Sequence, residues 1–260
     1  MKTRWHYPLW IAHRGAGKLA PENTLAAFRL GASHGFRAFE CDVKLSADGV
    51  PFLLHDETLE RTTNGQGTAG ELPWNLLSGL DAGSWHSNPF AGERLPSLEQ
   101  VAQYVIERGF ALNLEIKPTP DTDNLTGRVV AMHVRRLWAG HSPPPLLSSF
   151  RPAALAAAGH AAPELPRALL LDDFWSGWFE QLGALGCVAA VVNHKWLDAA
   201  VIDRLHAAKL RVLTYTVNDR TNVERLLGAG IDGIITDAVD EFAPDARALA
   251  GAGASDLKEA

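Results

Sequence analysis

The stretch ECDVKLSADGVPFLLHD, residues 40–56, decides the fold. Alternating apolar residues flank the dipeptide Asp48-Gly49, a pattern typical of a β-hairpin with a two-residue turn. If Ala47 and Val50 close that turn, the register predicts that Asp42 lies opposite His55 across the hairpin. The second arm is then antiparallel to the first.

The hairpin predicts one charged face and one apolar face, because successive side chains of a strand point to opposite sides. The expected faces are Glu40, Asp42, Lys44 and His55 on one side and Cys41, Val43, Leu45, Phe52 and Leu54 on the other. Two carboxylates and an imidazole held close together are costly unless a cation or a substrate uses them. The alternative is a solvated hairpin face with ordinary salt bridges.

Composition bounds the class of protein. The chain has 260 residues, 47% of them hydrophobic, which fits one large α/β-barrel domain or two small domains. The net charge of −6 argues against nucleic acid as the main partner. Cys41 and Cys187 lie far apart without metal-type spacing, so we expect two small buried hydrophobic residues and a reducing compartment. We find no signal-peptide pattern and no apolar run that approaches a membrane span, so we expect a cytoplasmic protein.

Eight short, mostly apolar runs predict parallel strands. They lie near residues 11, 39, 114, 148, 170, 191, 215 and 235, and the hairpin's return arm near residue 52 is left out because it is antiparallel. Helical segments separate most of these runs, so the α/β class and a closed (β/α)8 TIM barrel are predicted, with the site at the strand C-termini. An open doubly wound sheet is the alternative, but no strand is followed by a dinucleotide or P-loop motif.

The segments between the strands complete this single predicted domain, residues 1–260. Residues 56–96 are rich in glycine and proline, which predicts an inserted cap with a short helix at 73–77. The predicted helices of the barrel are 25–32, capped by Asn23 or Thr24, then 98–106, 124–139, 152–158, 175–185, 199–208 and 221–227. We expect the last dozen or so residues to be frayed.

Polar residues gather where the predicted strands end. They are His13, Arg14, Glu40, Asp42, His55, Glu115, Lys117 and Asn218. Each one alone has a structural explanation, such as a core histidine or a surface charge. Their common position at one mouth of a barrel favours a shared site.

The residue types at this mouth point to phosphoester cleavage. The carboxylates of Glu40, Asp42 and Glu115 form a hard oxygen site, which suits Mg²⁺, Ca²⁺ or Mn²⁺ better than zinc. Arg14 and Lys117 supply the fixed positive charge that a phosphate needs. Two histidines, His13 and His55, can serve as acid and base.

Seven short motifs together resemble the glycerophosphodiester phosphodiesterases, in their order and at plausible spacing. They are His13-Arg14-Gly15, Pro21-Glu22-Asn23-Thr24, Glu40-Cys41-Asp42-Val43, Asp48-Gly49-Val50-Pro51, His55-Asp56, Glu115-Ile116-Lys117 and Thr216-Val217-Asn218. The resemblance runs from about residue 10 to about residue 240. It implies a (β/α)8 barrel with a small insertion, and hydrolysis of glycerophosphodiesters such as glycerophosphocholine or glycerophosphoethanolamine to sn-glycerol 3-phosphate and an alcohol. We expect a monomer or a homodimer.

The resemblance also implies residue roles. It implies His13 and His55 as catalytic residues, Glu40, Asp42 and Glu115 as ligands of one divalent metal ion, and Arg14, Lys117, Asn218 and Tyr215 as substrate contacts. Tyr215 departs from the family, which often has tryptophan there; we expect the chemistry to be unchanged, while the shape of the glycerol pocket stays open. Which histidine is the acid stays open at this point.

Three alternatives remain open. A related lipid phosphodiesterase, of the lysophospholipase D or phosphoinositide type, would need an exposed apolar surface or an interfacial helix. A non-catalytic barrel that binds glycerol phosphates would lack a histidine or a carboxylate. Trp74, Trp85 and Phe90 of the insertion either shape the leaving-group side of the site or pack the cap.

Overall fold

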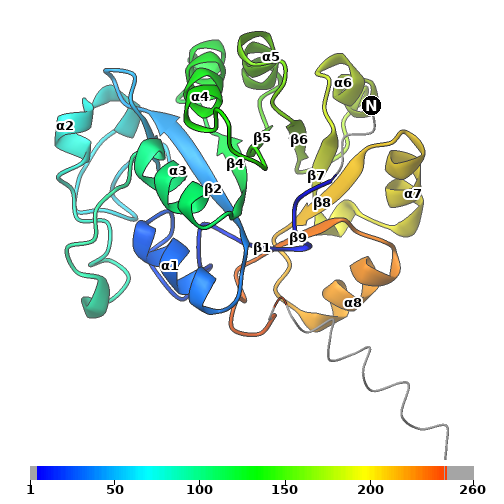
Figure 1. Ribbon diagram of the computed structural model, residues 1–260, viewed down its shortest axis with the longest axis horizontal. Coiled ribbons are helices and arrows are strands. Elements are labelled where there is room, and N and C mark those ends of the chain that lie inside the picture. Colours follow the sequence, from blue (N-terminus) through cyan, green and yellow to red (C-terminus); the bar gives the residue numbers. More distant parts are fainter. Residues whose placement is uncertain (1–4, 243, 245–260) are drawn as a thin grey trace, which may run out of the picture.

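The computed structural model describes residues 5–242 and residue 244, which form a closed barrel of eight parallel strands. Helices surround the strands as an outer ring (Figure 1). The barrel closes where β1 pairs with both β2 and β9. The barrel strands are β1 (Trp10–Ala12), β2 (Ala38–Leu45), β4 (Ala111–Ile116), β5 (Leu146–Ser149), β6 (Arg167–Leu171), β7 (Ala189–Asn193), β8 (Arg211–Tyr215) and β9 (Gly233–Thr236). All eight predicted strands and the TIM-barrel fold are confirmed.

Helices connect these strands as the sequence predicts, with boundaries that shift by a few residues at most. They are α1 (Leu25–Ser33), α3 (Leu98–Glu107), α4 (Asp123–Leu137), α5 (Pro152–Ala161), α6 (Trp178–Ala184), α7 (Ala199–Ala207) and α8 (Arg220–Gly228). The cap of α1 is Thr24, whose hydroxyl accepts a hydrogen bond from Ala27 N. Asn23 does not cap the helix and forms hydrogen bonds with Asp42 instead.

The predicted hairpin register is wrong by one residue. The return arm β3 (Pro51–Leu53) is antiparallel to β2 as expected, but Val43 pairs with Leu53 and Lys44 with Phe52. Leu54 N therefore donates to Asp42 O, so Leu54 rather than His55 lies opposite Asp42.

The reason is a loop of three residues instead of two. Ser46 N donates to Val50 O, which leaves Ala47, Asp48 and Gly49 in the loop, with Gly49 in the left-handed region at φ +81°. The Ser46 hydroxyl donates to the Asp48 carboxylate, and Trp74 N donates to the same carboxylate oxygen, which ties the longer loop to the insertion. The shift turns Phe52 and Leu54 away from the face on which they were expected.

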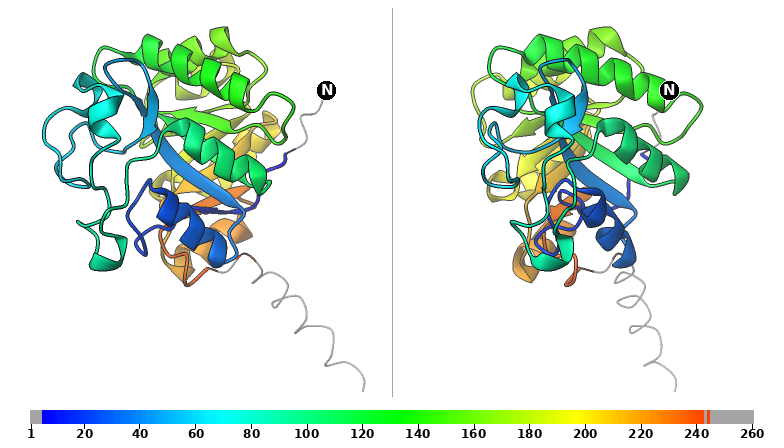
Figure 2. Two further views of the ribbon diagram at one scale, coloured as in Figure 1. Left: turned by 60° about the vertical axis from the view of Figure 1, so that its left-hand side comes forward. Right: turned by 90° about the vertical axis from the view of Figure 1, so that its left-hand side faces the viewer.

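The insertion between β3 and α3 forms a cap with its own small core. Figure 2 shows it beside β2, outside the ring of barrel helices. It contains η1 (Ala69–Glu71), the predicted short helix α2 (Trp74–Leu77) and η2 (Asn88–Phe90). Its buried cluster is Phe52, Leu54, Leu59, Ala69, Leu77, Ala82 and Leu95. Phe52 and Leu54, whose side chains were expected on the other face of the hairpin, thus join the cap to the barrel.

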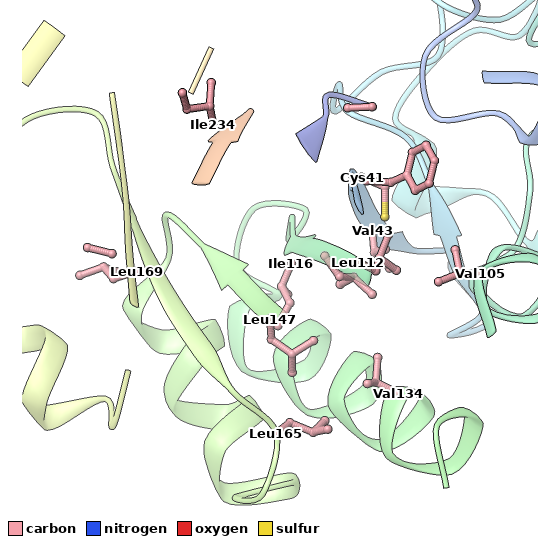
Figure 3. Packing of buried hydrophobic residues seen from close by; sticks show 14 of the residues in the cluster. Cys41, Val43, Val105, Leu112, Ile116, Val134, Leu147, Leu165, Leu169 and Ile234 are labelled. Carbon is pink, nitrogen blue, oxygen red and sulfur yellow. The ribbon is translucent and has the colours of Figure 1, made fainter. Parts of the chain in front are cut away.

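Two layers of apolar side chains hold the barrel. A small inner cluster fills the lower barrel and includes Ile11, Ala38 and Leu170. A larger cluster lies between the strands and the helices, and Figure 3 shows part of it, with Val43 on β2, Val105 on α3 and Val134 on α4. Alternation along the strands therefore leaves the inward positions near the strand ends for polar groups.

Three expectations concern other parts of the chain. Cys41 and Cys187 are both free and buried, as expected. Among the described residues, no helix is long and apolar enough to cross a membrane. The expectation for the last dozen residues lies outside the described residues. A short 3-10 helix, η3 (His194–Trp196), follows β7.

Candidate active site

A cavity of about 230 Å³ lies at the C-terminal ends of the strands. Seven of the nine residues assigned to the site from sequence line it: His13, Arg14, Glu40, His55, Glu115, Lys117 and Tyr215. Asp42 is buried beneath this lining, where it contacts Arg14 and Lys117. His55 reaches the cavity although its predicted register is wrong, because β3 ends at Leu53 and the chain then leaves the hairpin.

The three carboxylates converge inside the barrel. One oxygen from each of Glu40, Asp42 and Glu115 lies within 4.8 Å of the others, and all three residues are buried. Parallel pairing of β2 with β4 produces this arrangement, because it sets Asp42 beside Glu115 in register. The predicted carboxylate cluster is therefore present.

Burial and mutual repulsion act strongly on these carboxyl groups. Burial, followed by the charges of Asp42 and Glu115, raises the pKa of Glu40 well above its usual range. Burial and the charge of Asp42 raise the pKa of Glu115 to about 7. Burial would also raise the pKa of Asp42, but Arg14 and Lys117 hold it below its usual range. A bound divalent cation would remove this repulsion, so the donor set fits a hard cation of the Mg²⁺ or Ca²⁺ kind.

Two cations face the cavity over Asp42. Arg14 Nε lies 3.3 Å from Asp42 Oδ2, and Lys117 Nζ lies 3.4 Å from Asp42 Oδ1. Lys117 Nζ is also 3.4 Å from Glu115 Oε1. Arg14 has φ +49°, a left-handed conformation that is uncommon for a residue with a Cβ, and its backbone N–H donates to Glu40 Oε2. The strand end is thus bent so that Arg14 reaches the site.

The loop before α1 supports this arrangement residue by residue. Glu22 accepts a hydrogen bond from Arg14 Nη1 at 2.8 Å and two more from Arg61 of the cap. Asn23, with φ +59°, donates to Asp42 Oδ2 and accepts from Asp42 N. The Pro-Glu-Asn-Thr motif therefore positions Arg14 and Asp42 and begins helix α1.

Each histidine is held by a carboxylate that the sequence analysis did not assign to the site. His13 Nδ1 lies 2.6 Å from Asp237 Oδ1, and His55 Nδ1 lies 2.7 Å from Asp56 Oδ1. Because a carboxylate only accepts, each Nδ1 carries the proton and each Nε2 is left for chemistry in the cavity. His13 Nε2 lies 3.7 Å from Glu40 Oε2. Burial lowers the pKa of His55 although Asp42 opposes the shift.

Asn218 contacts Asp237. Its Nδ2 donates to Asp237 Oδ2, and its Oδ1 accepts from Asp237 N and from the Thr236 hydroxyl. The side chain of Asn218 thus positions the Asp237 carboxylate, which in turn contacts His13. Asp237 follows β9 directly, so the same strand-end signal that singled out Glu115 and Lys117 would have found it.

The cap aromatics pack within the cap. Trp74 lies against Phe52 at a ring-centroid distance of 5.8 Å, and Trp85 and Phe90 both lie against His86. The described lining of the cavity contains none of these three side chains. Of the two alternatives for these residues, packing of the cap is the one found.

The comparison with known families decides the relationship. The model of the glycerophosphoryl diester phosphodiesterase family matches residues 13–241, from the first catalytic candidate to beyond the last strand. The chain belongs to this family. The resemblance noted from the sequence motifs is confirmed.

Relatives agree along nearly the whole length. A glycerophosphodiester phosphodiesterase from Caldanaerobacter subterraneus is 32% identical over 236 residues, covering 88% of this chain and 93% of that protein. A phosphodiesterase from Oleispira antarctica, solved in complex with the product sn-glycerol-3-phosphate, is 33% identical with a TM-score of 0.84, covering 94% of this chain and 97% of that one. A glycerophosphodiester phosphodiesterase from Agrobacterium tumefaciens is 28% identical with a TM-score of 0.74, over 91% of this chain and 99% of that one.

Proposed function

We propose that this family member hydrolyses glycerophosphodiesters to sn-glycerol 3-phosphate and an alcohol, with one divalent metal ion, Mg²⁺, Ca²⁺ or Mn²⁺, as cofactor. The proposal is carried by one observation. A cluster of three buried carboxylates lies at the same small cavity as two histidines, each of which is hydrogen-bonded to a further carboxylate. The product named for the Oleispira antarctica structure supports the substrate class.

Glu40, Asp42 and Glu115 are the residues that would hold the metal ion. When bound, the ion neutralises charge on phosphoryl oxygens and lowers the pKa of a coordinated hydroxyl. The rest of the chemistry falls to the chain's own side chains.

Arg14 and Lys117 bind the phosphate. Both are partly exposed to the cavity while their charges are anchored on Asp42, so they are oriented before the substrate arrives. In the transition state they stabilise the negative charge that develops on the phosphoryl oxygens. Arg14 is further fixed by Glu22, which limits the loss of side-chain entropy on binding.

His13 and His55 move the protons. One Nε2 takes the proton of the attacking hydroxyl, and the other gives a proton to the leaving alcohol oxygen. Asp237 and Asp56 keep both imidazoles in the tautomer that this exchange needs and stabilise each imidazolium. Asn218 acts through Asp237 in this scheme.

The test is a coupled assay for sn-glycerol 3-phosphate with glycerophosphocholine as substrate. His13→Ala and His55→Ala should each lower kcat by about 10²- to 10⁴-fold, the usual contribution of a positioned acid or base. His160→Ala is the matched control, because His160 is exposed near the end of α5. If either site variant remained folded with near-normal kcat, the role proposed for that histidine would be wrong.

A further inference from the structure

One part of the cavity wall differs in chemistry from the metal-ligand candidates. In the closed strand order, β8 lies across the barrel from β4, and β6 lies across from β1. This part of the wall is lined by Leu170 of β6, Tyr215 of β8 and Phe150, which follows β5, the strand beside β4. The rings of Phe150 and Tyr215 meet edge to face at 5.8 Å between centroids and 84° between planes. The wall is therefore aromatic and apolar, and Phe150 is 36% exposed.

The carboxylate of Asp172 lies beside this aromatic pair. Tyr215 Oη donates to Leu171 O at 3.2 Å and lies 3.4 Å from Asp172 Oδ1. Asn193 Nδ2 donates to the same Asp172 oxygen at 2.9 Å, so this exposed carboxylate is held in place. Burial raises the pKa of Tyr215, and the charges that raise it further are those of Asp172, Glu115 and Asp173.

The nearby cations do not cancel this negative charge at the wall. Arg151, the neighbour of Phe150 in sequence, has its Nε 2.6 Å from Asp123 Oδ1. Lys195 is an exposed residue of η3, and its backbone N–H donates to Asn193 Oδ1. Arg14 and Lys117 are anchored on Asp42, at the metal-ligand side of the cavity. The described partners of Asp172 are Asn193 and Tyr215, neither of which is a cation, so its negative charge remains beside the aromatic pair.

We propose that Phe150 and Tyr215, together with the Asp172 carboxylate beside Tyr215, bind the leaving alcohol and select alcohols that carry a quaternary or primary ammonium group. A cation is attracted by the faces of aromatic rings and by a carboxylate beside them. The inference rests on the proposed function, which puts the glycerol hydroxyls beside Glu40, Asp42 and Glu115 and so directs the leaving alcohol away from these carboxylates. The cap aromatics Trp74, Trp85 and Phe90 are not part of the described lining of this cavity.

The experiment compares two substrates that differ in the charge of the leaving alcohol. These are glycerophosphocholine, which releases a cationic alcohol, and glycerophosphoglycerol, which releases a neutral one. The ratio of kcat/KM for the first to the second is measured in the wild type, Asp172→Asn, Phe150→Leu and Asp203→Asn. Asp203 is an exposed aspartate of α7, so its variant makes the same charge change away from the mouth.

We expect the wild-type ratio to favour the cationic alcohol and to fall by about 3- to 10-fold in Asp172→Asn and in Phe150→Leu, as for a partly exposed cation–aromatic site. Asp203→Asn should keep the wild-type ratio. Tetramethylammonium should inhibit the wild type competitively and Asp172→Asn more weakly.

Two results would overturn the inference: a wild-type ratio near one, or an unchanged ratio in both wall variants. Hydrolysis of neither substrate would instead contradict the proposed function. In that case the subsite is tested by calorimetry with tetramethylammonium. Saturable binding to the wild type that is weaker in Asp172→Asn would support the subsite, and equal binding or none would contradict it.

Discussion

His13 Nδ1 lies 2.6 Å from Asp237 Oδ1, and the two residues directly follow the first and last strands of the barrel. Closure of the barrel is thus what completes the proposed catalytic pair. Asp237→Asn keeps the shape but removes the acceptor that fixes the tautomer of His13, so kcat should fall by about 10²- to 10⁴-fold. KM should change much less. Steady-state kinetics with Asp240→Asn, an exposed neighbour, as control checks this, and a kcat within twofold of wild type would contradict it.

Gly49 fixes the hairpin register through its backbone. Its φ is +81°, and a Cβ added there would meet no atom within 4 Å, so the cost of Gly49→Ala is conformational alone. We expect a loss of about 1 kcal/mol in the free energy of unfolding. Gly183→Ala in α6 is the matched control, since it has the same free space in a helical backbone and should stabilise by up to about 1 kcal/mol. Urea titrations that gave the two variants the same sign would contradict this explanation of the register.

Sequence alone could predict the barrel because its signals are local. Short apolar runs that alternate with helical segments gave all eight strands, and strand ends gave most residues of the cavity. The hairpin register was missed for a non-local reason, since the Asp48 carboxylate binds both Ser46 and Trp74 of the cap. A dipeptide pattern does not contain that second contact.

The partners of the site residues were harder to predict than the residues themselves. Asp237 lies 224 positions from His13, so only closure of the barrel brings them together. Asn23 looked like a helix cap, but its left-handed backbone turns its side chain to Asp42 instead. Phe150 directly follows a strand but carries no charged or polar group, so the pattern of polar residues at strand ends did not predict it.

The carboxylate triad should bind a divalent cation with a measurable gain in stability. Glu115→Gln removes one ligand and part of the repulsion that raises the pKa of Glu40, so it should weaken metal affinity and also stabilise the metal-free protein. Thermal denaturation with and without Mg²⁺, Ca²⁺ or Mn²⁺ measures both effects. Glu107→Gln, a change of an exposed residue of α3, should keep the wild-type response. The ligand assignment would fail if Glu115→Gln kept the full metal-induced shift in Tm.

The glycerol 2-hydroxyl should be part of the chemistry. In a glycerophosphodiester it lies beside the ester phosphate, so a histidine that takes its proton would have an intramolecular nucleophile already in place. Water would then open a cyclic phosphate in a second step, with the two histidines exchanging roles. We expect the 2-deoxy analogue of glycerophosphocholine to lose orders of magnitude in kcat at saturation, and a cyclic glycerol phosphate to be hydrolysed. Comparable kcat values for the two diesters would mean that water attacks directly.

The most direct measurement follows sn-glycerol 3-phosphate released from glycerophosphocholine by protein that has been stripped of metal and then given Mg²⁺, Ca²⁺ or Mn²⁺. We predict no turnover in excess chelator and recovery with at least one of these ions, because the buried cluster of Glu40, Asp42 and Glu115 needs a cation. Full turnover by protein that elemental analysis shows to be free of metal would contradict metal-dependent phosphodiester hydrolysis at this site.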